Sequence, residues 1–206
     1  MNHLYEQLTA LKLTGFRDAL KKQLAQPGTY QELGFEERLS LLTAEELTCR
    51  ENRKAERLIK HARFRLNAEL SKLDYRNNRG LDRALIRSLS QGNWLTLKQN
   101  ILLTGATGSG KTFLACALGH NACRQGYKVY YYRLKALMEQ CYQGHADGRY
   151  SKLLTRLNNS DLLLLDDWGL EPLSSEQRSD LLEIVDLMYQ RGSIIVVRQL
   201  PVESWY

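Results

Sequence analysis

Residues 100–112 of this chain read Asn-Ile-Leu-Leu-Thr-Gly-Ala-Thr-Gly-Ser-Gly-Lys-Thr. The apolar run from Ile101 to Leu103 predicts a short buried strand, and the residues that follow Thr112 have helical composition. Between them the sequence matches the pattern G-x-x-x-x-G-K-[ST] of a phosphate-binding loop, in the strand–loop–helix order that this loop requires. The alternative is a glycine-rich turn with no ligand, which the complete match and its context disfavour.

The loop offers the groups that a bound nucleotide needs. Its glycines let backbone N–H groups turn towards phosphate oxygens, and the N-terminus of the following helix adds a partial positive charge. We expect Lys111 to reach the β- and γ-phosphates and the hydroxyl of Thr112 to bind Mg²⁺. The predicted phosphate-binding residues are Gly105, Ala106, Thr107, Gly108, Ser109, Gly110, Lys111 and Thr112.

A second informative stretch covers residues 161–169. Four leucines predict a strand that is buried on both faces, as in parallel sheets. Asp166 and Asp167 follow at its carboxyl end, where ligands bind in open α/β sheets. We expect Asp166 to hold the metal through water and Asp167 to orient or deprotonate the attacking water. A helix cap or a second metal contact is the alternative for Asp167.

A further buried strand is predicted over residues 193–197, and Arg198 and Gln199 follow it. In a parallel sheet the tip of this strand would lie beside the phosphate loop. Gln199 or Arg198 could therefore contact the γ-phosphate or the attacking water, and Gln199 is taken as the candidate.

The charge of the chain is distributed unevenly. The formal net charge is +6, and the 18 basic and 12 acidic residues of positions 1–99 account for all of that excess. A basic region of this kind points to a polyanionic partner for the N-terminal part.

The N-terminal part is predicted to be helical. Leucines at helical spacing cover residues 3–25, with a possible break at Gly15, and a second helix is predicted over 30–70. A row of basic side chains on the second helix could lie along a phosphate backbone, although a solvated helix face is the simpler meaning. The candidate DNA contacts are Arg50, Arg53, Lys54, Arg57, Lys60 and Arg63.

These features together predict an α/β fold of the P-loop NTPase type, a parallel sheet with helices on both faces, preceded by a small helical domain. The predicted parts are a basic helical domain over 1–72, a linker over 73–98 and a nucleotide-binding core over 99–206.

Four cysteines without CxxC spacing predict reduced thiols. No apolar run is long enough to span a bilayer and no signal peptide opens the chain, so a cytoplasmic protein is expected.

The chain resembles the IstB-like ATPases, the helper proteins of certain insertion-sequence transposons. The resemblance rests on the phosphate loop, on Arg50-Glu-Asn-Arg, on Arg79-Gly-Leu-Asp-Arg-Ala-Leu, on Leu162-Leu-Leu-Leu-Asp-Asp-Trp-Gly-Leu and on Gln199-Leu-Pro-Val. It implies an AAA+ ATPase that uses ATP and Mg²⁺, forms a homo-oligomer on duplex DNA and stimulates a transposase. A related group, the DnaC-type helicase loaders, implies a replicative helicase as partner instead.

The sequence departs from the family pattern in two places. Arg198 stands where the family has a small hydroxyl residue, and the chain ends where the family continues with a last strand and a lid. We therefore expect the chain to bind ATP but to hydrolyse it poorly, and the strand before the phosphate loop to lie at a sheet edge. A remnant that binds DNA without turning over ATP is a third reading.

Overall fold

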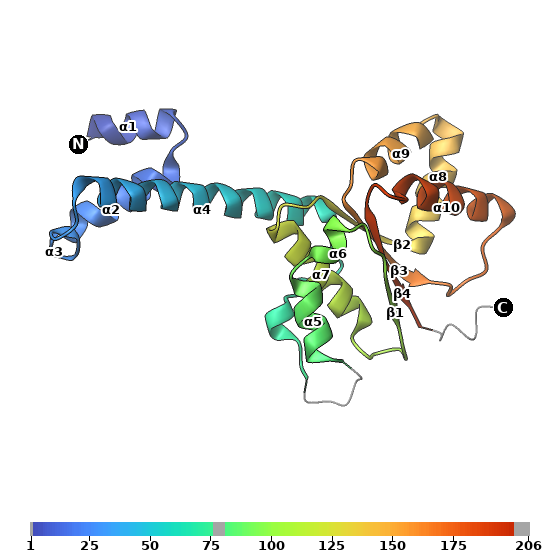
Figure 1. The fold of residues 1–206 in the computed structure, drawn as a ribbon. Coiled ribbons are helices and arrows are strands. Elements are labelled where there is room, and N and C mark those ends of the chain that lie inside the picture. The colour runs from blue at the N-terminus through green and yellow to red at the C-terminus, as the bar shows by residue number, and fades with distance from the viewer. Residues whose placement is uncertain (1, 76–80, 200–206) are drawn as a thin grey trace. The chain divides into compact units, whose positions relative to one another are not determined.

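A computed structural model describes residues 2–75 and 81–199 (Figure 1). The chain forms two compact units, Met1–Glu56 and Arg57–Tyr206. The division between them falls within helix α4 (Phe35–Ala62), whose last residues belong to the second unit. The sequence segments 76–80 and 200–206, which include part of the predicted linker and the end of the Gln-Leu-Pro-Val signature, lie outside the described residues.

The first unit is helical, as predicted. It contains α1 (Asn2–Ala10), α2 (Thr14–Ala25), α3 (Pro27–Tyr30) and the first part of α4. The predicted break at Gly15 is wrong, because α1 and α2 are separated at residues 11–13 and Gly15 lies inside α2. A Cβ at Gly15 would lie 2.7 Å from the Cβ of Cys49 and 2.9 Å from the carbonyl oxygen of Glu45. This glycine therefore allows α2 to pack closely on α4.

Helix α4 is shorter than the predicted helix over 30–70. It ends at Ala62, and Arg63 adopts a left-handed backbone conformation with φ 54°. A left-handed residue is a common way for a helix to end. The segment that follows is irregular up to a short 3₁₀ helix, η1 (Leu70–Lys72).

The second unit is built on a parallel four-stranded sheet. Its strands are β1 (Ile101–Thr104), β2 (Val129–Arg133), β3 (Leu162–Trp168) and β4 (Ser193–Arg198). They lie in the order β1-β4-β3-β2, and every neighbouring pair is parallel. Strand β1, which precedes the phosphate loop, lies at one edge of the described sheet, and its tip pairs with the tip of β4.

Helices cover both faces of this sheet (Figure 1). They are α5 (Arg83–Ser90), α6 (Asn93–Thr96), α7 (Lys111–Arg124), α8 (Leu134–Asp147), α9 (Tyr150–Asn158) and α10 (Ser175–Met188). Leu162 and Leu164 of β3 belong to the core formed with α5, α6 and α7. Leu163 and Leu165 belong to the core formed with α8, α9 and α10. The leucine run is thus buried on both faces, as predicted.

The second unit starts earlier than the composition suggests. Residues 62–70 fall within the predicted helical domain, yet Ala62 and Ala68 are buried in the core of the sheet unit. The ring of Phe64 lies 4.4 Å from that of His120, and a Cβ at Gly119 of α7 would come within 2.5 Å of Phe64. The packing of this segment on α7 places it beside the phosphate loop.

The four cysteines are unpaired, as predicted. Burial raises the pKa of Cys123 and of Cys141 to about 12, so both thiols stay protonated near neutral pH and behave as apolar core groups. Among the helices described within 2–75 and 81–199, none is both long and apolar enough to cross a bilayer.

Candidate nucleotide-binding site

The loop between β1 and α7 has a backbone conformation that glycine permits. The φ angles of Gly105, Gly108 and Gly110 are 147°, 80° and 92°, where residues with a Cβ are strained. Gly110 directly precedes Lys111, the first residue of α7. The free N–H groups of the first helical turn therefore border the loop, and with the helix dipole they favour an anion there.

The side chain of Lys111 folds back over the loop. Its Nζ donates hydrogen bonds to the carbonyl oxygens of Gly105 and Ala106, both at 2.7 Å, and lies 3.4 Å from Oγ of Ser109. All three acceptors are neutral. Phosphate oxygens would attract this ammonium group more strongly, because they carry negative charge and the three present acceptors do not.

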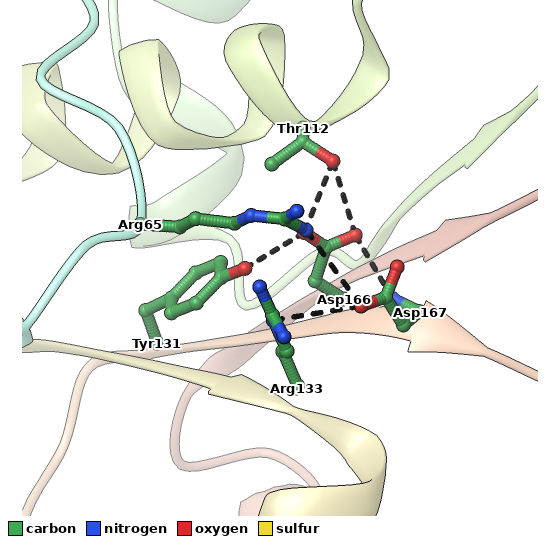
Figure 2. Close-up of polar contacts among 6 residues, drawn as sticks. All are labelled: Arg65, Thr112, Tyr131, Arg133, Asp166 and Asp167. Atoms are coloured by element: carbon green, nitrogen blue, oxygen red, sulfur yellow. Dashed lines mark hydrogen bonds and ion pairs between the residues drawn. The ribbon is translucent and has the colours of Figure 1, made fainter. Parts of the chain in front are cut away.

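Asp166 lies at the carboxyl end of β3 and is almost completely buried, with 1% of its surface exposed. Figure 2 shows the donors around its carboxylate. Thr112 Oγ1 donates to it at 3.0 and 3.2 Å, Tyr131 Oη at 2.7 Å and the backbone N–H of Asp167 at 2.9 Å. These hydrogen bonds offset the cost of burying a charge. They also join the phosphate loop to the sheet.

Tyr131 is a buried donor that stays protonated. Burial, followed by the hydrogen bond and the charge of Asp166, raises the pKa of Tyr131 well above its ordinary value. The phenol therefore donates to Asp166 at every physiological pH. Strand β2 positions it, since β2 pairs with β3 as far as Arg133 opposite Asp166.

Asp167 has a different environment, although it follows Asp166 directly. Its φ is 59°, and the pairing of β3 with β4 is irregular between Leu165 and Trp168. Its Oδ2 lies 3.7 Å from a guanidinium nitrogen of Arg65 and 3.7 Å from one of Arg133 (Figure 2). These are long ion pairs on partly exposed side chains. The helix-cap alternative finds no support, because α10, the next helix, is capped by Ser174.

Gln199 lies beside the phosphate loop, as the sequence predicted from the strand tip. Thr107 Oγ1 donates to its Oε1 at 2.8 Å. Arg198 faces elsewhere, since a Cβ at Gly169 would lie 3.1 Å from the guanidinium carbon of Arg198. Of the two candidates, Gln199 is therefore the one beside the loop.

A cavity of about 430 Å³ brings these groups together. Its volume is in the range of small-ligand sites. The residues that line it are Arg65, Leu66, Thr107, Gly108, Gly110, Lys111, Thr112, Phe113, Arg133, Asp166, Asp167, Val197 and Gln199.

The whole second unit and most of the first match a known family model, described as IstB-like ATP binding protein, over residues 6–206. The chain belongs to the IstB-like ATP-binding protein family. It is 45% identical over 200 residues to a protein of Pseudomonas fluorescens named as the ATP-binding protein of insertion sequence IS1162, covering 97% of this chain and 86% of that one. It is 41% identical over 201 residues to the insertion sequence ATP-binding protein y4pL of Sinorhizobium fredii, covering 98% and 82%.

Solved structures place the IstB-like sheet unit among AAA+ proteins. The DnaC helicase loader is 29% identical with a TM-score of 0.58, over 67% of this chain and 80% of that one. DnaA of Aquifex aeolicus with bound AMPPCP has a TM-score of 0.60 at 22% identity, over 67% and 43%, and is a likeness of fold. The predicted fold class is confirmed.

The chemistry of the IstB-like site fits ATP and Mg²⁺. The Thr112 hydroxyl and the Asp166 carboxylate each offer an oxygen atom as a metal ligand, and the two groups are already in contact. Mg²⁺ prefers oxygen ligands of this kind together with water and phosphate. No group of three or more His, Cys, Asp or Glu side chains suited to a metal occurs within residues 2–75 and 81–199. When bound with ATP, Mg²⁺ would neutralise charge on the phosphates, with Thr112 and Asp166 as its protein ligands.

The sequence prediction missed three residues of this site: Arg65, Tyr131 and Arg133. Arg133 had a signal that could have found it, because it ends β2 and parallel strands end at one edge of a sheet. Tyr131 lies within β2, two positions before its end, and β propensity explained its place in a strand better than a ligand contact did. Arg65 had none, because only the packing of the segment after α4 brings it to Asp167.

The six candidate DNA contacts are exposed on and just after α4. Arg50 forms an ion pair with the buried Glu46, whose Oε2 also accepts from the backbone N–H of Phe16 in the first unit. Arg63 lies just beyond the helix and not within it. Three of the six, Arg57, Lys60 and Arg63, belong to the second unit.

Proposed function

We propose that this protein is an ATP- and DNA-binding helper of transposition, which assembles as a homo-oligomer on duplex DNA and assists a transposase. The observation that carries the proposal is the hydrogen bonding of Thr112 to Asp166, which joins the phosphate loop to the carboxyl end of β3. The two relatives described above are both named as insertion-sequence ATP-binding proteins, which supports the transposition setting.

The residues have distinct roles in this proposal. Lys111 and the loop hold the phosphates, Thr112 and Asp166 hold Mg²⁺, and Gln199 senses the terminal phosphate. Asp167 positions the attacking water once Arg65 and Arg133 no longer pair with it. Since both arginines lie 3.7 Å from its carboxylate, we expect the isolated chain to bind ATP and to turn it over slowly.

The DNA contacts of the proposal are the exposed cations of α4 and Arg63. Such side chains neutralise phosphates without reading bases, so we expect DNA affinity to be insensitive to sequence and to fall steeply with salt. ATP binding would order subunits along the DNA, and hydrolysis would release them.

Replacement of Lys111 by alanine tests the nucleotide site. Loss of charge-assisted hydrogen bonds worth roughly 1.5–3 kcal/mol each predicts a fall of at least tenfold to a hundredfold in ATP affinity. Isothermal titration with ATP and Mg²⁺ measures it, with Lys152→Ala as a control that removes an exposed lysine outside the cavity. Unchanged affinity in Lys111→Ala would contradict the site assignment.

A helicase loader is the second candidate, favoured by the 29% identity and TM-score of 0.58 to the DnaC helicase loader. Both candidates share the ATP site and differ in the partner. Co-purification from cells that hold the insertion sequence separates them, since a transposase is expected in one case and a hexameric helicase in the other. DNA affinity that is retained without any ATP turnover would favour the remnant reading instead.

A further inference from the structure

A second cavity, of about 330 Å³, lies on the sheet unit away from the phosphate loop. It is bordered by the end of α4, by the outer strand β2 and by α8 and α9. We call it the Arg–Tyr cavity; its lining residues are His61, Ala62, Arg63, Tyr130, Tyr131, Tyr132, Arg133, Ala136, Gln140 and Arg156.

The ionisable groups that line the Arg–Tyr cavity include basic side chains but no carboxylate. Three arginines and a histidine line it, and no Asp or Glu is among the lining residues. Within residues 2–75 and 81–199, no carboxylate forms an ion pair with Arg63 or Arg156. Arg133 pairs with Asp167 at 3.7 Å, so Arg63 and Arg156 are the two arginines of the cavity whose charge no carboxylate among the described residues neutralises. An anion in the cavity would lower the free energy of these two cations.

Arg156 contacts three other side chains that line this cavity. Its guanidinium carbon lies 5.8 Å from the ring centroid of Tyr130 and 5.9 Å from that of Tyr132. Its Nη2 donates to Oε1 of Gln140 at 3.0 Å. A guanidinium has five N–H donors in a planar fork, and this is the one hydrogen bond recorded for it among the described residues. Most of its donors are therefore available to a ligand.

Further basic side chains lie beyond the cavity. A neighbouring hollow shares Gln140 and Arg156 with it and adds Lys152 and Arg149, the latter paired with Asp147. Basic side chains thus line two adjoining hollows. A single small anion would contact one of them, whereas a nucleic acid carries a phosphate on every nucleotide and can contact both. Since Arg156 already lies over the two tyrosine rings, the site favours phosphates over stacked bases.

We propose that the Arg–Tyr cavity binds the phosphate backbone of DNA. The proposal deepens the proposed function, on which it rests, by adding a contact on the sheet unit to those of α4. Arg133 lines both this cavity and the nucleotide cavity. A phosphate bound in the Arg–Tyr cavity would compete with Asp167 for Arg133, so DNA bound there would act on the carboxylate that we assign to water activation.

The test measures binding of a fluorescent duplex and of a labelled single strand by anisotropy, at several salt concentrations, for the full chain. We expect Arg156→Gln to weaken binding by about threefold to tenfold and to lower the salt slope by about 1, because one phosphate contact is lost. Arg156→Lys should weaken binding less, since it keeps the charge and loses the planar fork.

Arg191→Gln is the matched control, because it removes the same charge from a side chain outside the cavity. Arg191 donates a hydrogen bond to Oδ1 of Asn158. Isothermal titration with ATP checks each variant for an intact fold and nucleotide site. A DNA affinity and salt slope of Arg156→Gln equal to those of Arg191→Gln would overturn the proposal.

Two further outcomes separate this inference from the proposed function. If Lys54→Gln and Lys60→Gln weaken DNA binding while Arg156→Gln does not, the inference fails and the proposed function stands. If the wild-type chain binds no DNA, both fail. A third outcome comes from counting the molecules of mant-ADP, a fluorescent nucleotide, that bind to each chain. Two per chain in the wild type and one in Arg156→Gln would mean that the cavity takes a free nucleotide, and the DNA assignment would be wrong.

Discussion

Two neighbouring regions of the nucleotide site, the floor around Asp166 and the rim around Asp167, are built in opposite ways. Asp166 is 1% exposed and accepts hydrogen bonds from Thr112, Tyr131 and its neighbour's backbone, all within 3.2 Å. The side chain of Asp167 is 26% exposed and has two ion pairs at 3.7 Å to arginines that are themselves about half exposed. The floor is therefore set by the fold, whereas the rim can rearrange when a ligand binds.

Replacement of each aspartate by alanine gives the largest contrast. We expect Asp166→Ala to lower the free energy of unfolding by about 2–3 kcal/mol, because it leaves buried donors without an acceptor. Asp167→Ala should change it by no more than about 1 kcal/mol, since exposed ion pairs contribute little. Urea denaturation of both variants measures the difference. Equal stability of the two would remove the distinction between floor and rim.

The hydroxyl of Tyr131 gives a smaller effect within the floor. Tyr131→Phe removes one hydrogen bond to Asp166 and should lower the free energy of unfolding by about 1 kcal/mol. Tyr130→Phe is the matched control, because the same change is made one residue earlier on β2, where no hydrogen bond to Asp166 is made. A loss in the control as large as in Tyr131→Phe would mean that the hydroxyl of Tyr131 is not what stabilises the floor.

The arginines of the rim give the smallest effect, which appears in activity and not in stability. Arg65→Gln and Arg133→Gln should each raise ATP turnover of the isolated chain by about twofold to fivefold, because each frees Asp167 from a partly exposed ion pair worth at most about 1 kcal/mol. Phosphate-release assays at saturating ATP measure it, with Arg191→Gln as the control. A fall in turnover would indicate that these arginines hold the phosphates in the working enzyme.

The sequence predicted the floor better than the rim. The spacing of Gly105, Gly110 and Lys111 and the leucine run before Asp166 are local patterns with a direct physical meaning, and both stand where they were expected. The pairing of Arg65 with Asp167 joins residues about a hundred positions apart through exposed, flexible side chains, which no local pattern encodes. The packing of residues 62–70 on α7 was missed because it, too, joins segments that are distant in the sequence, in this case through buried side chains such as Ala62 and Ala68.

By itself, the sequence determined the parallel sheet, the phosphate loop and the position of Asp166 at a strand end, because backbone geometry and apolar periodicity act over a few residues. Only the tertiary structure decided that Gly15 serves helix packing, that Asp167 lies between two arginines and that Arg63, Tyr132 and Arg156 line one cavity. Those arrangements depend on which surfaces meet when the core is buried, and that is a property of the whole chain.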